Sequence, residues 1–205
     1  FGEAVVVQAI RLAHRAVCEL VLALVIQHSL SQSIGKQDSH VAALGRAFSL
    51  AQEAFLSTSP VVQAPMLMAA IEALIGSKEN TSKTIAERIV TLMEPEKSCR
   101  PDCVKQIKYL YDIRSNIVHG TKIEQPELAV EMMRSTLASL LYVFIAGRDQ
   151  LAPLNLDPAD NHRDFLKRLD EHYLTASCIF PEPILLPIRA SWGVPDWSGS
   201  PRVSH

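Results

Sequence analysis

Apolar residues recur every three or four positions along most of this chain, which is the spacing of one face of an α-helix. The pattern predicts one helix over residues 3–30. It predicts a second that begins after a capping Asp38 or Ser39 and ends before residues 57–60. The apolar face of the second helix is expected to comprise Val41, Leu44, Phe48, Ala51 and Phe55.

Proline, glycine and apolar positions predict two central helices. The first, over about residues 64–75, is expected to open with Pro65, where a missing amide costs nothing, and to stop at Gly76. Because this segment is apolar on all sides, we expect it to be buried all round, with Glu72 as the exception. A shorter helix is expected over residues 82–93, with three inward side chains, Ile85, Ile89 and Leu92.

Two longer helices are predicted next. Pro101 is expected to start the first of them and Gly120 to end it. Pro126 is expected to start the second, with Gly147 after it. The apolar side of this second helix is predicted to comprise Met133, Leu137, Leu140, Leu141 and Phe144.

The last part of the chain is more polar. Asp157 and Pro158 predict the start of a helix that runs to about Leu174. Beyond Thr175 a helix is excluded by Pro181, Pro183, Pro187, Pro195 and Pro201. Trp192 and Trp197 still give this tail apolar surface to bury, so we expect it to lie extended on the helical body.

The predicted class is all-α: an antiparallel helical bundle of six to seven helices with an extended, proline-rich C-terminal tail. We expect an N-terminal helix within 1–37 and the main bundle over 38–147. We expect a C-terminal helix within 148–174 and the tail over 175–205. The sequence shows no internal repeat.

Composition and charge narrow the functional classes. Of 205 residues, 48% are hydrophobic and 20% charged, as in ordinary globular proteins, and a net charge of −2 disfavours a non-specific nucleic-acid coat protein. Between Lys97 and Lys122, however, six basic residues face only two acidic ones. This stretch is either a solvated helix face or one that meets an anion. Phe1 in place of a start methionine predicts a processed form or an excised piece of a longer chain, which could lack an upstream domain.

Four cysteines, unevenly spaced, do not suggest a disulfide framework, and a cytoplasmic location is the simpler expectation. No stretch approaches the roughly 18 uninterrupted apolar residues of a membrane span, so we expect no membrane partner. Cys99 and Cys103 are not followed by a second ligand pair with zinc-like spacing, and no metal or other cofactor is predicted.

Arg114 is the residue that stands out chemically. It falls near the middle of the apolar side of its predicted helix, where an unpaired guanidinium would cost several kcal/mol, so it needs an anion. Glu72, the lone acid of the buried helix, is the natural partner. Two interpretations follow: a purely structural ion pair, or a pair in which Glu72 aims Arg114 at a ligand phosphate.

His119 lies at the end of the same helix, directly before Gly120. A histidine there can move protons near neutral pH, or it can simply cap a free carbonyl group. On an ideal helix it lies about 140° from Arg114, so a loosened last turn or a second subunit is needed to bring the two together. Two other histidines, His162 and His172, fall in the polar C-terminal helix and are expected to be exposed.

The segment from Arg114 to His119 resembles the Arg-x4-6-His motif of the HEPN superfamily of small helical bundles. The sequence Ala-Ile-Glu-Ala-Leu-Ile at 70–75 and Tyr-Asp-Ile-Arg-Ser-Asn-Ile-Val-His-Gly at 111–120 resemble the Apea-like HEPN branch. The likeness covers about residues 40–147. The Arg-x4-His spacing alone is weakly specific, and the flanking sequences make it moderately so.

This resemblance implies metal-independent RNA cleavage by a homodimer, with His119 as the proton carrier and Arg114 neutralising the phosphate. Glu72, Ser115 and Asn116 would support that pair, and Lys105, Lys108 and Lys122 would bind RNA. It further implies the effector part of a toxin or antiviral-defence system, controlled by an upstream sensor or an antitoxin.

Two departures from the family pattern are visible. Many active relatives carry Asn, Asp or His directly after the arginine, where this chain has Ser115. Relatives modified by a nucleotidyltransferase antitoxin carry a tyrosine two residues after the histidine, where this chain has Thr121. A non-catalytic dimerisation module, or one that binds RNA or a nucleotide, is therefore the alternative.

Overall fold

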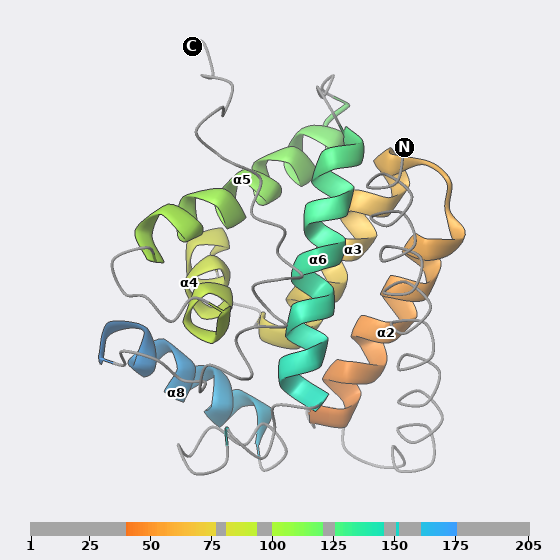
Figure 1. The fold of residues 1–205 in the computed structure, drawn as a ribbon. Coiled ribbons are helices and arrows are strands. Elements are labelled where there is room, and N and C mark those ends of the chain that lie inside the picture. The colour runs from red at the N-terminus through yellow and green to blue at the C-terminus, as the bar shows by residue number, and fades with distance from the viewer. Residues whose placement is uncertain are drawn as a thin grey trace, which may run out of the picture.

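The computed structural model describes residues 40–76, 81–93, 100–120, 126–145, 151 and 161–175. Within these ranges the backbone forms six helices and no strand, so the predicted all-α class is confirmed. The helices are α2 His40–Leu56, α3 Pro60–Ile75, α4 Ser82–Met93, α5 Arg100–Val118, α6 Pro126–Ile145 and α8 His162–Thr175 (Figure 1). The helix predicted over 3–30 and the tail predicted after 175 lie outside the described residues.

The arrangement centres on α3. Helices α2 and α3 form an antiparallel hairpin joined by residues 57–59, and α6 lies along both of them (Figure 1). Helix α5 packs against α3, α4 and α6, while α8 packs on α4. Since α3 contacts α2, α4, α5 and α6, the nearly all-apolar sequence of α3 is explained by neighbours on most of its sides.

One hydrophobic core unites all six helices. It includes Phe48, Leu74, Ile89, Leu110, Phe144 and Phe165, each at most 1% exposed. Because Phe165, Leu166 and Leu169 of α8 belong to this cluster, the C-terminal helix shares its core with the main bundle. The core residues predicted for α4 and α6 are all buried.

The buried face of α2 differs from the predicted one. Leu44, Phe48 and Ala51 are buried, but Val41 and Phe55 are only half-buried. Their places are taken by small residues, namely Ala43, Ala47 and Ala54. Alanine has no side chain beyond Cβ, so an alanine-rich face lets α3 approach α2 closely.

The start of α3 was predicted wrongly. The helix begins at Pro60, not near Pro65, and Pro65 lies inside it. Pro60 occupies the first turn, where no intrahelical partner for its nitrogen exists, and Ser59 supplies the carbonyl oxygen that accepts from the amides of Val62 and Gln63. Pro65 therefore removes one hydrogen bond of the helix ladder, and tertiary packing outweighs that loss.

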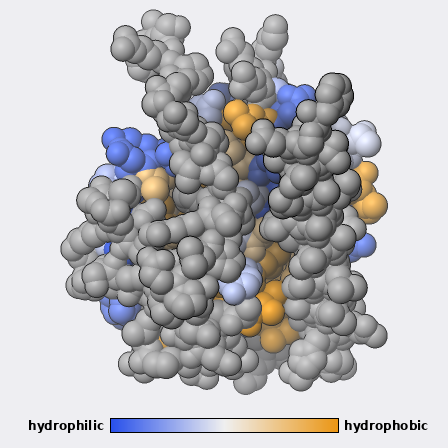
Figure 2. Space-filling model, viewed as in Figure 1, coloured by the Kyte–Doolittle hydropathy of each residue, from blue (hydrophilic) through white to orange (hydrophobic). Residues whose placement is uncertain are grey.

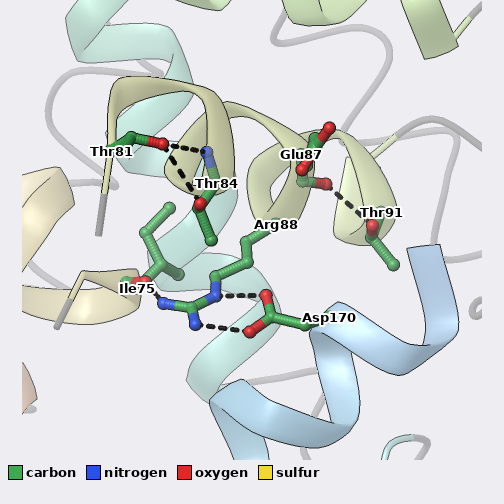
Figure 3. Close-up of polar contacts among 7 residues, drawn as sticks. All are labelled: Ile75, Thr81, Thr84, Glu87, Arg88, Thr91 and Asp170. Carbon is green, nitrogen blue, oxygen red and sulfur yellow. Dashed lines mark hydrogen bonds and ion pairs between the residues drawn. The ribbon is translucent and has the colours of Figure 1, made fainter. Parts of the chain in front are cut away.

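An ion pair between buried Arg88 and half-exposed Asp170 fixes α8 to α4. The Arg88 guanidinium donates to both carboxylate oxygens of Asp170 at 2.6 Å and to the carbonyl oxygen of Ile75 at 2.8 Å (Figure 3). Arg88 is 4% exposed, so it can be accommodated only because its fork is met by acceptors. This contact joins α3, α4 and α8 at one point.

Helix α8 begins at His162, about one turn later than predicted from Asp157 and Pro158. The side-chain oxygen of Asn161 accepts from the backbone amides of Arg163 and Asp164, at 3.0 and 3.4 Å. Asn161 is therefore the N-cap, a role for which asparagine is strongly preferred.

Helix α6 is long and apolar enough, by length and composition, to cross a membrane. More than half of its most apolar window is buried inside the bundle, and it packs against α3, α4 and α5. The central helix of a globular core has the same composition, which accounts for the apolar character of α6.

Candidate functional site

Helix α5 ends as predicted, in a turn made by His119 and Gly120. The amide of His119 donates to the carbonyl oxygen of Ser115 at 3.0 Å, and the amide of Gly120 donates to that of Ile117 at 3.1 Å. Gly120 has φ +73°, a left-handed conformation that glycine adopts without strain. The helix therefore stops directly after Val118 and leaves His119 at its tip.

Arg114 lies at the edge of the core. The buried face of α5 includes Leu110, Ile113 and Ile117, and Arg114 is half-buried beside it. Its Nε atom is buried and has no hydrogen-bond partner. A guanidinium in this position can bind an anion from outside, because the described residues offer its Nε no acceptor.

The predicted ion pair between Arg114 and Glu72 is not formed. Glu72 is half-buried on α3, which packs against α5, but none of its carboxylate oxygens lies within 4.0 Å of the Arg114 nitrogens among the described residues. The expectation that the two charges lock the helices together directly is therefore wrong.

Tyr111 lies near both charges, and the sequence did not single it out as a site residue. Its hydroxyl oxygen is buried and has no hydrogen bond of good geometry, only a loose contact with the Glu72 carboxylate. Burial raises the pKa of Tyr111 well above its usual value, the nearby Glu72 carboxylate raises the pKa further, and Arg114 opposes these effects. Its position three residues before Arg114, on the same helical side, was the signal available in the sequence.

The His119 side chain is exposed and makes no hydrogen bond or ion pair with the described part of the chain. Its backbone amide, not its imidazole, takes part in ending the helix. No hydrogen bond joins the His119 imidazole to the Arg114 guanidinium within the described chain.

The supporting and RNA-binding residues are distributed unevenly. Ser115 is half-buried, and Asn116 and Lys108 are exposed. Lys105 is exposed too, but its ammonium group lies 2.8 Å from the Asp102 carboxylate, one turn earlier on α5. Lys122 lies outside the described residues. The exposed lysines on α5 could meet a phosphate backbone, with Lys105 partly neutralised by its neighbour.

Arg100 does not belong to this basic surface. It is 1% exposed, and its Nη1 donates to the backbone carbonyl oxygen of Tyr173 at 3.2 Å. Its role is to join the start of α5 to the end of α8, so one positive charge of the basic stretch is structural.

A second group of titratable side chains lies at the opposite end of the bundle. The rings of His40 and Phe144 stack with centroids 5.2 Å apart, and His162 lies 6.1 Å from His40 and from Phe165. His162 is 8% exposed, so the expectation that it is exposed is wrong. As the first residue of α8, it points its ring into the core. His172, also expected to be exposed, is half-buried and its Nδ1 is buried, so that expectation is wrong too.

The surroundings of His162 keep it neutral. Both of its ring nitrogens are buried and have no hydrogen bond of good geometry, and a weak interaction with the Leu74 backbone offsets their burial only in part. Burial, followed by the positive charges of Arg46 and Arg88, lowers the pKa of His162 to about 4. A neutral imidazole that is shielded from solvent and packed among aromatic rings indicates a structural role for His162.

A metal site finds no support in the described ranges. No three histidine, cysteine, aspartate or glutamate side chains gather there in a way that could hold an ion. Cys103 is half-buried and forms no disulfide with the described residues, and Cys99 lies outside the described residues.

No family model, curated protein or solved structure matches this chain. The arrangement of side chains around α5 is therefore the ground on which a function can be proposed.

Proposed function

We propose that this chain is a HEPN-type endoribonuclease that cleaves RNA without a metal ion, by attack of a ribose 2′-hydroxyl on the adjacent phosphate. The observation that carries the proposal is the state of Arg114: a half-buried guanidinium whose Nε has no acceptor, on the helix that ends in an exposed His119. An unmatched cation beside a titratable imidazole suits a phosphate in which negative charge develops.

Each group has a defined part in the proposed reaction. His119 removes the proton from the 2′-hydroxyl, whose oxygen then attacks phosphorus. Arg114 neutralises the charge that accumulates on the phosphorane oxygens. The partner subunit's His119 gives a proton to the departing 5′-oxygen. The products are a 2′,3′-cyclic phosphate and a 5′-hydroxyl, so atoms and protons balance without a co-reactant.

A homodimer is part of the proposal because Arg114 and His119 fall about 140° apart on an ideal helix and no interaction joins them within the described chain. Exposed apolar side chains support it: Val118 is 56% exposed directly before His119, and Leu128 in the first turns of α6 is 47% exposed. The space-filling view shows hydrophobic atoms on the surface between the grey segments (Figure 2). Apolar residues around the tip of α5 favour burial against another surface.

A second candidate is a non-catalytic module that binds RNA or a nucleotide through Arg114. The His119 imidazole has no hydrogen-bond acceptor to orient it in the described chain, whereas general bases are commonly held by one. Such a module would need the guanidinium but not an ionisable group at position 119.

The substitution His119→Ala distinguishes the two functions. We expect it to reduce RNA cleavage in EDTA by at least about 100-fold, the scale of a lost general base, while helical circular dichroism stays unchanged. His172→Ala, which removes a histidine from α8, is the matched control and should cleave like the wild type. Equal cleavage by the His119→Ala and wild-type proteins would reject the enzymatic function.

A further inference from the structure

Three polar side chains meet where α3 packs on α5. Glu72 comes from α3, and Tyr111 and Arg114 come from α5. All three are half-buried. Residues three apart on a helix are surface neighbours, so the hydroxyl of Tyr111 and the guanidinium of Arg114 share one side of α5.

Two polar atoms of this group, on Tyr111 and Arg114, have hydrogen-bonding capacity that is not used. The Tyr111 hydroxyl oxygen and the Arg114 Nε are both buried, and neither has a partner at good hydrogen-bond geometry among the described residues. The hydroxyl has only a loose contact with the Glu72 carboxylate. A buried donor without an acceptor is costly and uncommon, and here two occur one turn apart on the same helix. Only one carboxylate, that of Glu72, acts on Tyr111, and it forms no ion pair with Arg114.

We propose that Tyr111 is a positioning residue whose hydroxyl holds the Glu72 carboxylate and so keeps Arg114 from being neutralised within the protein. The inference rests on the proposed function, because it takes an RNA phosphate as the anion that Arg114 then receives. Contacts of this kind are often long or poorly aligned without substrate and tighten in the complex, which fits the loose contact between the Tyr111 hydroxyl and the Glu72 carboxylate.

Loss of the hydroxyl has a specific consequence. Without Tyr111 as a donor, Arg114 is the positive group left to the Glu72 carboxylate, and the two can form the direct ion pair that the wild type lacks. A guanidinium already paired with a carboxylate binds phosphate more weakly. Removing the carboxylate charge as well should restore binding.

Binding can be measured apart from cleavage with a fluorescent 2′-O-methyl RNA oligonucleotide, which lacks the attacking hydroxyl. The full chain is titrated into this probe and fluorescence anisotropy is followed at several salt concentrations. We expect Tyr111→Phe to weaken binding about tenfold and to lower the salt dependence by about one phosphate contact. Glu72→Gln in the Tyr111→Phe background should return the affinity to within about twofold of the wild type.

Tyr109→Phe is the matched control, since Tyr109 is 40% exposed on the same helix, and it should leave binding unchanged.

The substitution Arg114→Ala distinguishes the role of Tyr111 from the proposed anion site at Arg114. If Arg114→Ala weakens binding and Tyr111→Phe does not, the positioning role of Tyr111 is overturned and the role of Arg114 stands. A loss in Tyr111→Phe that Glu72→Gln fails to restore also overturns it. If Arg114→Ala binds like the wild type, both the proposed anion site and this inference are overturned.

Discussion

Among single residues, His162 shows how burial can control protonation. Its ring is packed against His40, Phe144 and Phe165, and its nitrogens have no hydrogen bond of good geometry. Protonation would place a charge in this site beside Arg46 and Arg88. The folded protein therefore binds the proton less readily than the unfolded chain does.

The consequence is a loss of stability in acid. The pKa of His162 is about 4 in the folded protein and 6.5 ordinarily, so the unfolded state binds more protons between these values. Stability should be unaffected by this group above pH 6.5, fall as the pH drops towards 4, and then level off. The total loss is about 3 kcal/mol.

Urea unfolding at pH 7.5 and pH 4.5 measures this effect. His162→Phe removes the titrating group and keeps a ring in the cluster, so its stability should depend less on pH than that of the wild type. Arg163→Ala, at the exposed neighbouring position, is the control and should keep the wild-type pH dependence. Identical pH dependence in the wild type and His162→Phe would contradict the burial argument.

Residue-level properties were only partly predictable from the sequence. Helical periodicity placed Arg114 near the middle of the apolar side of its helix, whereas the structure places it, half-buried, at the edge of the core. The missing ion pair with Glu72 was not predicted either, because whether Glu72 reaches Arg114 depends on how α3 and α5 pack. His162 was missed for a similar reason: as the first residue of α8, its direction is set by the approach of the chain and by neighbouring rings, and not by the pattern of the helix.

Among the helices, α5 is defined by its C-terminal turn. Gly120 has φ +73°, and a Cβ there would meet nothing within 4 Å. The effect of a side chain on stability therefore depends on the backbone conformation alone. The left-handed region costs an L-residue about 1–2 kcal/mol. Gly120→Ala should therefore lower the free energy of unfolding by about 1 kcal/mol, measured by urea unfolding.

The same substitution in α2 should have the opposite sign. Gly45 is exposed within α2, and a Cβ there also meets nothing within 4 Å. Alanine is the better helix former by about 1 kcal/mol, so Gly45→Ala should stabilise the protein by a similar amount. A change of the same sign in both variants would contradict the assigned end of α5.

The helices themselves were predictable where periodicity and end signals agree. The bounds expected for α4, residues 82–93, match Ser82–Met93. For α3, the two prolines were ambiguous: each can open a helix, and only the Ser59 carbonyl interactions show that Pro60 does so. For α8, the true cap, Asn161, competed with an equally plausible Asp157 and Pro158.

For the molecule as a whole, the proposed function requires two copies. Val118, exposed beside His119, would lie in the contact between them. We expect the protein to have a mass near twice its chain mass of 22.6 kDa by light scattering, and Val118→Glu to shift it towards 22.6 kDa, because the introduced charge would be buried without a partner.

Tyr142→Glu is the control for the dimer, since Tyr142 is exposed in the last turn of α6, away from the tip of α5 (Figure 1). Its mass should equal that of the wild type. A wild-type protein that stays at 22.6 kDa up to high micromolar concentration, with or without RNA, would count against a shared site.

The all-α class was predictable because helical periodicity runs through nearly the whole described chain, and loops too short for crossovers favour hairpins such as α2–α3. The common core of α8 and the bundle was not, since it depends on Phe165 and Leu169 meeting residues more than 70 positions earlier, as Arg88 meets Asp170. Sequence patterns specify faces of helices but not which faces meet.

The nature of the RNA ends tests the central claim most directly. The wild-type protein is incubated with a defined RNA in EDTA, and the termini are analysed by mass spectrometry. We predict 2′,3′-cyclic phosphate and 5′-hydroxyl ends, absent when the RNA carries 2′-O-methyl groups. Intact RNA, or products ending in a 3′-hydroxyl and a 5′-phosphate, would contradict a reaction that Arg114 and His119 carry out on a ribose 2′-hydroxyl.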